Sequence, residues 1–207
     1  MRIGSNTKTF VAATVMQLVG EGKVKLDEPI DTYLPGVVEG PDYDGKKITV
    51  RNLLGHTSGL PDYTEFVDSD TAGVPSRTYT AEELLEPALK HKAAFPVGKR
   101  RRYSNTNYIV AGMLVTKVTG KPVGEAVTER VINRLGLRQT YWPRPGDKSV
   151  RKPRMEGYVA PPGGSCGTPP RWTRRSPGPP AWWCPLRVIS TASSPHWSAA
   201  SWCPPLS

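Results

Sequence analysis

The sequence predicts a globular, mainly helical segment over residues 1 to about 160, followed by an anomalous tail over residues 161–207. Apolar residues recur at helical spacing through the first segment, with capping residues before the runs and Pro or Gly between them. The tail differs in composition, since it holds 11 of the 22 prolines and 5 of the 6 tryptophans, whereas all 18 acidic residues lie at or before Glu156. We expect one domain with a hydrophobic core, which a chain of 207 residues is long enough to build.

The helices of the first segment are expected from their boundary signals. A mostly buried helix should start at Ser5 and run to Gly20, and Thr80 with the acidic residues after it has the pattern of an N-cap. Glycines stop the last two helices, and prolines break the region after the first helix into turns. The expected helices cover residues 5–20, 50–54, 80–92, 108–118 and 123–135.

The tail is better explained by a shifted reading frame than by low complexity. Disordered segments rarely contain tryptophan, and a shifted frame turns the codons of Trp182-Trp183-Cys184 into Met, Leu or Val followed by Val-Val. A shift near Gly163 restores acidic residues and an amphipathic helix. A genuine Trp- and Pro-rich extension is the alternative. The three cysteines, Cys166, Cys184 and Cys203, all lie in the tail, and their number and spacing indicate neither a metal site nor a disulfide framework.

The formal charge of +10 raises nucleic acid as a possible partner. The run Lys99-Arg100-Arg101-Arg102 beside Tyr103 would be the contact surface. The basic excess is partly an absence of acids from the tail, and the sequence contains no nucleic-acid fold motif, so we expect no such partner. No apolar run approaches the roughly 20 residues of a membrane span, and the first residues do not form a secretory signal. The chain as written is therefore expected in the cytoplasm.

The first motif that could carry out catalysis is Ser5-Asn6-Thr7-Lys8, which has S-x-x-K spacing. Positions i and i+3 of a helix lie on one face, so Lys8 can deprotonate Ser5 if burial or a nearby cation keeps the amine partly neutral. A serine at a helix start also has its backbone N–H available for an oxyanion. The alternative is an N-cap serine followed by a solvated lysine.

The second motif, Tyr103-Ser104-Asn105, begins 98 residues after Ser5 and precedes a buried helix. A tyrosine can act as a general acid or base where a nearby cation lowers its pKa, and Lys8 would be such a cation. The amide of Asn105 can orient Lys8 or bind a substrate carbonyl. Alternatively, Asn105 is the N-cap of the helix and Tyr103 packs as a half-buried aromatic residue, and both interpretations can hold together.

Three ordered motifs resemble the serine beta-lactamase-related and penicillin-binding protein family, and within it the D-alanyl-D-alanine carboxypeptidase and class C beta-lactamase branch. They are RIGSNTKTF at residues 2–10, LLGHTSGL at 53–60 and YSNTNY at 103–108. The resemblance covers about residues 1–160. It implies an α/β (α+β) beta-lactamase-like fold, with an antiparallel sheet flanked by helices plus a helical domain, of which this chain covers mainly the helical part.

The resemblance also implies residue roles and a reaction. Ser5 would be acylated, Lys8 and Tyr103 would shuttle protons, and Asn105 would help to hold substrate. The expected reaction is hydrolysis of D-Ala-D-Ala peptides, beta-lactams or related esters through an acyl-enzyme, without a cofactor or metal. His56 falls in a block that is structural in the family, so we expect it to fix a loop rather than to act in catalysis.

Two departures from the family pattern lead to further expectations. Family members have a segment before the S-x-x-K helix, whereas Met1 stands four residues before Ser5, and no Lys- or His-Thr-Gly triplet follows Asn105. We expect a chain truncated at its N-terminus, with an extracellular or cell-envelope location for the complete family member. Because one lost oxyanion donor alone lowers a rate roughly 100- to 1,000-fold, an inactive fragment or pseudoenzyme is the alternative function.

Overall fold

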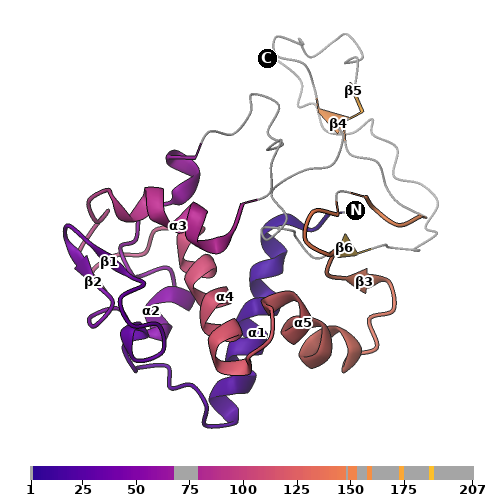
Figure 1. The fold of residues 1–207 in the computed structure, drawn as a ribbon, viewed down its shortest axis with the longest axis horizontal. Coiled ribbons are helices and arrows are strands. Elements are labelled where there is room, and N and C mark those ends of the chain that lie inside the picture. The colour runs from indigo at the N-terminus through magenta and orange to yellow at the C-terminus, as the bar shows by residue number, and fades with distance from the viewer. Residues whose placement is uncertain are drawn as a thin grey trace, which may run out of the picture.

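Helices dominate the part of the chain that the structure, a computed structural model, describes (Figure 1). The described residues are 2–67, 79–147 and 149–152, together with two-residue strands at 158–159, 173–174 and 187–188. The anomalous tail and its cysteines therefore lie outside the described residues, apart from the last two of these strands.

Two long helices, α1 (Thr7–Gly20) and α4 (Thr106–Thr119), pack against each other at the centre of the helical part. The helices α2 (Val50–Leu54) and α3 (Ala81–Leu89) contact α4 from one side, and α5 (Val123–Val127) contacts both α1 and α4 from the other (Figure 1). Because neighbours surround α4, its sequence is apolar around most of the helix rather than along one stripe.

The hydrophobic core consists of two clusters. The larger one joins α1, α2, α3 and α4 through a fully buried leucine from each helix: Leu18, Leu53, Leu84 and Leu114. The smaller one lies where α1 and α4 meet α5 and the residues after it, and its buried members are Val11, Ala111, Val127 and Ile132. Burying one such leucine stabilises the fold by about 1.5–3 kcal/mol relative to leaving it exposed.

The expected helix starts are confirmed to within two residues, and the exact positions have local causes. A 3-10 turn, Gly4–Asn6, precedes α1, so Ser5 lies in the turn before the helix rather than at its first residue. At α3 the predicted cap is present, because the Thr80 side chain accepts from the Glu83 N–H while the Glu83 side chain accepts from the Thr80 N–H.

The expected helix ends differ more. The helix α3 ends at Leu89 instead of near Lys92, because its last turn tightens to i→i−3 bonds from Lys90 to Pro87 and from His91 to Ala88. The expected helix over 123–135 divides into α5 and a π-helical segment, Thr128–Asn133.

The β-structure of the described residues consists of three antiparallel two-stranded ladders and isolated bridges such as that between Pro29 and Thr49. The ladders are formed by β1 (Glu39–Gly40) with β2 (Tyr43–Asp44), β3 (Thr140–Tyr141) with β6 (Arg187–Val188), and β4 (Tyr158–Val159) with β5 (Thr173–Arg174). The antiparallel pairing that the family resemblance implied is thus present, in a chain that is mainly helical.

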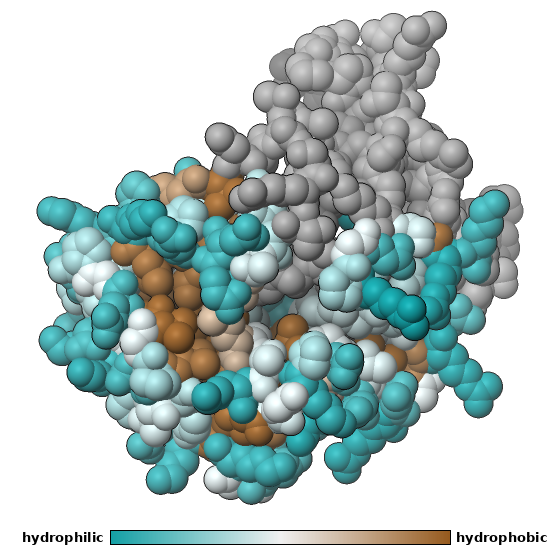
Figure 2. Space-filling model, in the orientation of Figure 1, coloured by the Kyte–Doolittle hydropathy of each residue, from teal (hydrophilic) through white to brown (hydrophobic). Residues whose placement is uncertain are grey.

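Figure 2 shows that polar side chains cover most of one face of the molecule, with a band of apolar residues visible beside α3 and α4. Among the helices described, none combines the length and the apolar character that crossing a membrane requires.

Candidate active site

Ser5 and Lys8 lie one turn apart where α1 begins. Ser5 is exposed in the Gly4–Asn6 turn, and Lys8 in the first turn of α1 is only 9% exposed. The Lys8 Nζ donates to the Ser5 Oγ at 3.3 Å. The S-x-x-K spacing thus brings amine and hydroxyl together as predicted, with the amine on the protein side and the hydroxyl on the solvent side.

Tyr103 and Asn105 come to the same place from the loop before α4. The Tyr103 Oη lies 2.7 Å from the Ser5 Oγ, and the Lys8 Nζ donates to the Asn105 Oδ1 at 2.8 Å. The Tyr103 hydroxyl is also 3.3 Å from the Asn105 Oδ1. The packing of α1 on α4 therefore joins all four residues singled out from the sequence into one hydrogen-bonded group.

The environment of Lys8 shifts its pKa in the direction that a proton acceptor needs. Burial lowers the pKa of Lys8 to about 8, and the negative charge of Asp62 acts against that shift. The ammonium form also faces the rings of Tyr103 and Tyr108, with centroids at 5.0 Å and 5.8 Å. Near neutral pH, Lys8 can thus both hold and release a proton.

Asn105 stands at the N-cap position of α4 but does not cap the helix with its side chain. Its backbone is already helical, with φ −66° and ψ −30°, and the side chain makes no capping hydrogen bond. Instead the amide nitrogen Nδ2 donates to Asp62 Oδ2 at 2.9 Å, while Oδ1 accepts from Lys8. Asn105 therefore holds the N-cap position that the sequence suggested, but it does not cap with its side chain, because both ends of the amide are engaged by groups outside the helix.

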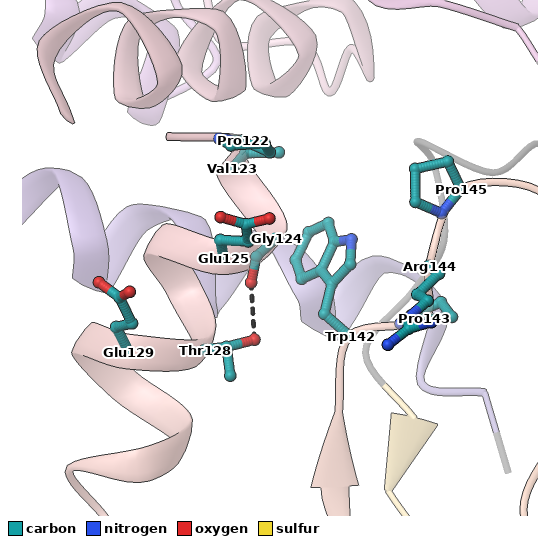
Figure 3. A pocket seen from close by; sticks show the side chains of 10 residues that line it. All are labelled: Pro122, Val123, Gly124, Glu125, Thr128, Glu129, Trp142, Pro143, Arg144 and Pro145. Atoms are coloured by element: carbon teal, nitrogen blue, oxygen red, sulfur yellow. Dashed lines mark hydrogen bonds between the residues drawn. The ribbon is translucent and has the colours of Figure 1, made fainter. Parts of the chain in front are cut away.

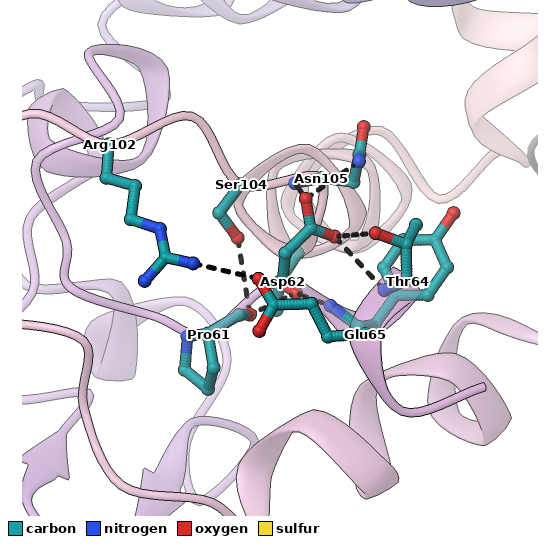
Figure 4. A network of polar contacts seen from close by, with 9 residues as sticks. Pro61, Asp62, Thr64, Glu65, Arg102, Ser104 and Asn105 are labelled. Atoms are coloured by element: carbon teal, nitrogen blue, oxygen red, sulfur yellow. Dashed lines mark hydrogen bonds and ion pairs between the residues drawn. The ribbon is translucent and has the colours of Figure 1, made fainter.

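Asp62 is the member of this group that the sequence interpretation missed (Figure 4). Its Oδ1 accepts from the N–H and Oγ1 of Thr64, and so caps the 3-10 turn Tyr63–Glu65. An aspartate two residues before a threonine has the pattern of such a local turn. That local pattern carries no sign of the contact with Asn105, which lies 43 residues further along the chain.

His56 lies beneath the site in a left-handed backbone conformation with φ 58°. Its side chain is buried, and Nδ1 accepts from the Ser104 N–H at 3.3 Å. A backbone N–H can only donate, so Nδ1 is the ring nitrogen without a proton. The Asn107 Nδ2, 3.2 Å from Nδ1, therefore also donates to it. Burial, followed by the charge of Lys8, lowers the pKa of His56. The His56 ring joins two segments and lies tilted by 32° against the Tyr103 ring, with 4.7 Å between centroids, which agrees with the expected loop-fixing role.

A pocket of about 470 Å³ lies elsewhere, between α5 and the residues after β3 (Figure 3). Trp142 packs there against Gly124, where a Cβ would approach the indole to 2.4 Å. None of the four candidate residues lines this pocket. Within the described ranges, no group of three or more His, Cys, Asp or Glu side chains is placed to hold a metal ion.

Comparisons with known proteins agree on one family. Residues 1–183 match the family described as Beta-lactamase. The chain is 30% identical over 144 residues to a putative D-alanyl-D-alanine carboxypeptidase of Escherichia coli (strain K12), a match that covers 67% of this chain and 32% of that protein.

Two solved structures are also similar to the chain. A D-stereospecific amidohydrolase from Streptomyces sp. has 37% identity and a TM-score of 0.78, over 90% of this chain and 56% of that one. A D-amino acid amidase from Ochrobactrum anthropi SV3 has 33% identity and a TM-score of 0.59, over 69% of this chain and 41% of that one. The chain thus spans about a third of the curated relative and about half of the solved ones. A family match over most of the sequence confirms what the three motifs indicated: the chain belongs to the beta-lactamase family.

Proposed function

We propose that the chain carries the acyl-transfer centre of a serine hydrolase, with Ser5 as the nucleophile. The observation that carries this proposal is the pair of contacts made by the Ser5 Oγ, 2.7 Å from the Tyr103 hydroxyl and 3.3 Å from the Lys8 amine. A hydroxyl within reach of two groups that can exchange protons is the arrangement that serine nucleophiles need for activation.

In the acylation step, the Ser5 Oγ forms a bond to the substrate carbonyl carbon while its proton passes to Lys8 or Tyr103. The tetrahedral intermediate then breaks its bond to the leaving nitrogen or oxygen, which takes up that proton. Tyr103 is suited to this delivery because it is 49% exposed, whereas Lys8 is buried. In deacylation, water attacks the ester carbonyl and gives up a proton to the same groups, and Ser5 leaves with its own proton restored.

The proposed substrates are D-Ala-D-Ala peptides, beta-lactams or related esters. Three of the similar proteins support an amide or peptide next to a D-amino acid, namely the D-alanyl-D-alanine carboxypeptidase, the D-stereospecific amidohydrolase and the D-amino acid amidase. An extracellular or cell-envelope location of the complete protein is part of the same proposal.

Covalent labelling with a fluorescent penicillin tests the proposal. The wild-type chain is expected to retain the fluorophore through denaturing electrophoresis, because a Ser5 acyl ester survives unfolding. Ser5→Ala should reduce labelling at least about a thousandfold, as the loss of a catalytic nucleophile does elsewhere. Ser149→Ala is the matched control, since Ser149 is exposed, bonds to Asp147 and should label like the wild type.

The alternative is an inactive fragment that keeps the fold without turnover. A folded wild-type chain that labels no better than Ser5→Ala would favour that alternative and reject the proposed centre. A labelled chain that hydrolyses an L-Ala-L-Ala peptide as fast as the D-Ala-D-Ala peptide would keep the centre and reject the proposed preference for a D-amino acid.

A further inference from the structure

Asp62 uses its two carboxylate oxygens for two different tasks (Figure 4). One oxygen, Oδ1, accepts from the Thr64 N–H at 3.1 Å and from its hydroxyl at 2.9 Å. The other, Oδ2, accepts from the Asn105 N–H at 3.1 Å and from its Nδ2 at 2.9 Å. The carboxylate therefore ties the turn after Pro61 to the residue before α4.

The contact with Nδ2 decides which way the Asn105 amide faces. The two ends of an asparagine amide have nearly the same shape but opposite hydrogen-bonding roles, and an ionised carboxylate can only accept. Asp62 therefore selects the NH₂ end of Asn105 and leaves Oδ1 toward Lys8 at 2.8 Å. A reversed amide would place NH₂ donors against the Lys8 amine and against the Tyr103 hydroxyl, which also lies within 3.3 Å of Oδ1.

Asp62 also acts on Lys8 through its charge. Among the described residues, the titratable groups that face Lys8 include Tyr103 from the loop before α4, Tyr108 from α4, His56 from the loop after α2, and Asp62. Among the causes that shift the pKa of Lys8, burial lowers it and Asp62 raises it. The carboxylate thus favours the protonated amine without touching it.

We propose that Asp62 is a positioning residue of the Ser5 centre, which holds Asn105 in the amide orientation that Lys8 and Tyr103 require. This inference rests on the proposed function. It assigns Asp62 a task beyond the cap of the Tyr63–Glu65 turn, and the two tasks are separable because they use different oxygens.

Asp62→Asn is the variant that tests the inference. An asparagine offers one acceptor oxygen instead of two and carries no charge, so it cannot serve Thr64 and Asn105 together. The rate of acylation by the fluorescent penicillin is expected to fall roughly 10- to 100-fold, as for the loss of a hydrogen bond to a charged group. The acidic limb of the pH–rate profile should move to lower pH, because the charge that raises the pKa of Lys8 is gone.

Two control variants separate positioning from turn structure. Thr64→Val removes the hydroxyl that bonds to Oδ1 and leaves the Asp62–Asn105 contacts in place. Glu65→Gln removes an acid from the same turn, where it pairs with Arg102 (Figure 4). Both should keep the wild-type rate and profile. If Thr64→Val slows acylation as much as Asp62→Asn, the turn alone matters and the positioning role is overturned.

An NMR titration of Lys8 in the full chain gives a readout that does not need turnover. A lower Lys8 pKa in Asp62→Asn than in the wild type, together with a changed Asn105 side-chain amide signal, would show that Asp62 sets the amide orientation whether or not the wild-type chain is labelled, so a failure of the proposed function is distinguished from a failure of the inference. Unchanged Lys8 and Asn105 signals overturn the inference while labelling of the wild type leaves the proposed function standing.

Discussion

Two effects at the position of Lys8 shift the pKa of its amine in opposite directions. Burial removes the water that would stabilise its charge, while the negative charge of Asp62 favours the protonated amine. The result is a pKa of about 8, well below the ordinary value of 10.5 for lysine. An amine at this pKa exchanges its proton easily at the pH of most biological fluids, which an exposed lysine does not.

The pH dependence of acylation should follow the neutral form of Lys8. Below about pH 8 we expect the rate of penicillin acylation to rise about tenfold per pH unit, and above it to level off, because each unit increases the neutral fraction tenfold. A stopped-flow pH–rate profile checks this. A rate that is unchanged between about pH 6 and pH 9 would show that Lys8 does not have to lose its proton.

The same pKa has a consequence for stability, with a defined sign. Between about pH 8 and the ordinary value of 10.5, unfolded Lys8 keeps a proton that folded Lys8 has lost. Because the unfolded state binds more protons in this window, the contribution of Lys8 to the free energy of unfolding increases as the pH rises through it.

At the scale of single elements, α4 depends on its last turn. Gly120 follows the helix with φ +68°, and its N–H bonds to the Thr116 carbonyl. Gly120→Ala should lower the free energy of unfolding by about 1–2 kcal/mol, since a side chain disfavours this left-handed conformation. Chemical denaturation measures the change. Gly20→Ala, at the end of α1 with ordinary φ and open space around it, should be neutral or stabilising by up to about 1 kcal/mol.

Elements whose signals are local could be predicted from the sequence. The capping box at Thr80 and the glycine after α4 act within a few residues, so sequence spacing reveals them. The π-helical turn at Thr128–Asn133 could not be predicted in this way, because the same apolar spacing fits an α-helix. Each strand pair joins only two residues on each side, which leaves no alternation long enough to recognise.

The same difference between local and long-range signals applies to the residues of the candidate site. Ser5 and Lys8 are neighbours on one turn, and Tyr103 and Asn105 are neighbours in one loop, so each pair was visible in the sequence. Their meeting was expected from the chemistry of the side chains, since Lys8 could act on Tyr103 and Asn105 could orient Lys8, and from the family resemblance. Asp62 was hidden because its cap on Thr64 accounts for it locally, whereas its contact with Asn105 exists only after α4 has packed.

For the molecule as a whole, stability depends on the cluster that joins four helices. Leu114 of α4 is fully buried in it. Leu114→Ala should lower the free energy of unfolding by about 2–5 kcal/mol, through lost transfer energy and the cavity left behind. Leu135→Ala is the matched control, since Leu135 is 66% exposed and the change should stay within about 0.5 kcal/mol. If urea titrations show a similar loss of unfolding free energy for both variants, Leu114 does not lie in the hydrophobic core.

Tyr103 follows Ser5 by 98 positions, so the active centre can form only late in the synthesis and folding of the chain. A ribosome releases the N-terminal part first, so Ser5 emerges long before its tyrosine has been synthesised. Closing so long a loop costs chain entropy, which the docking of α1 on α4 helps to offset. If the proposed function holds, Ser5 in the nascent chain stays unreactive toward electrophiles until α4 has been synthesised and has packed on α1. Acylation of Ser5 therefore reports that both steps are complete.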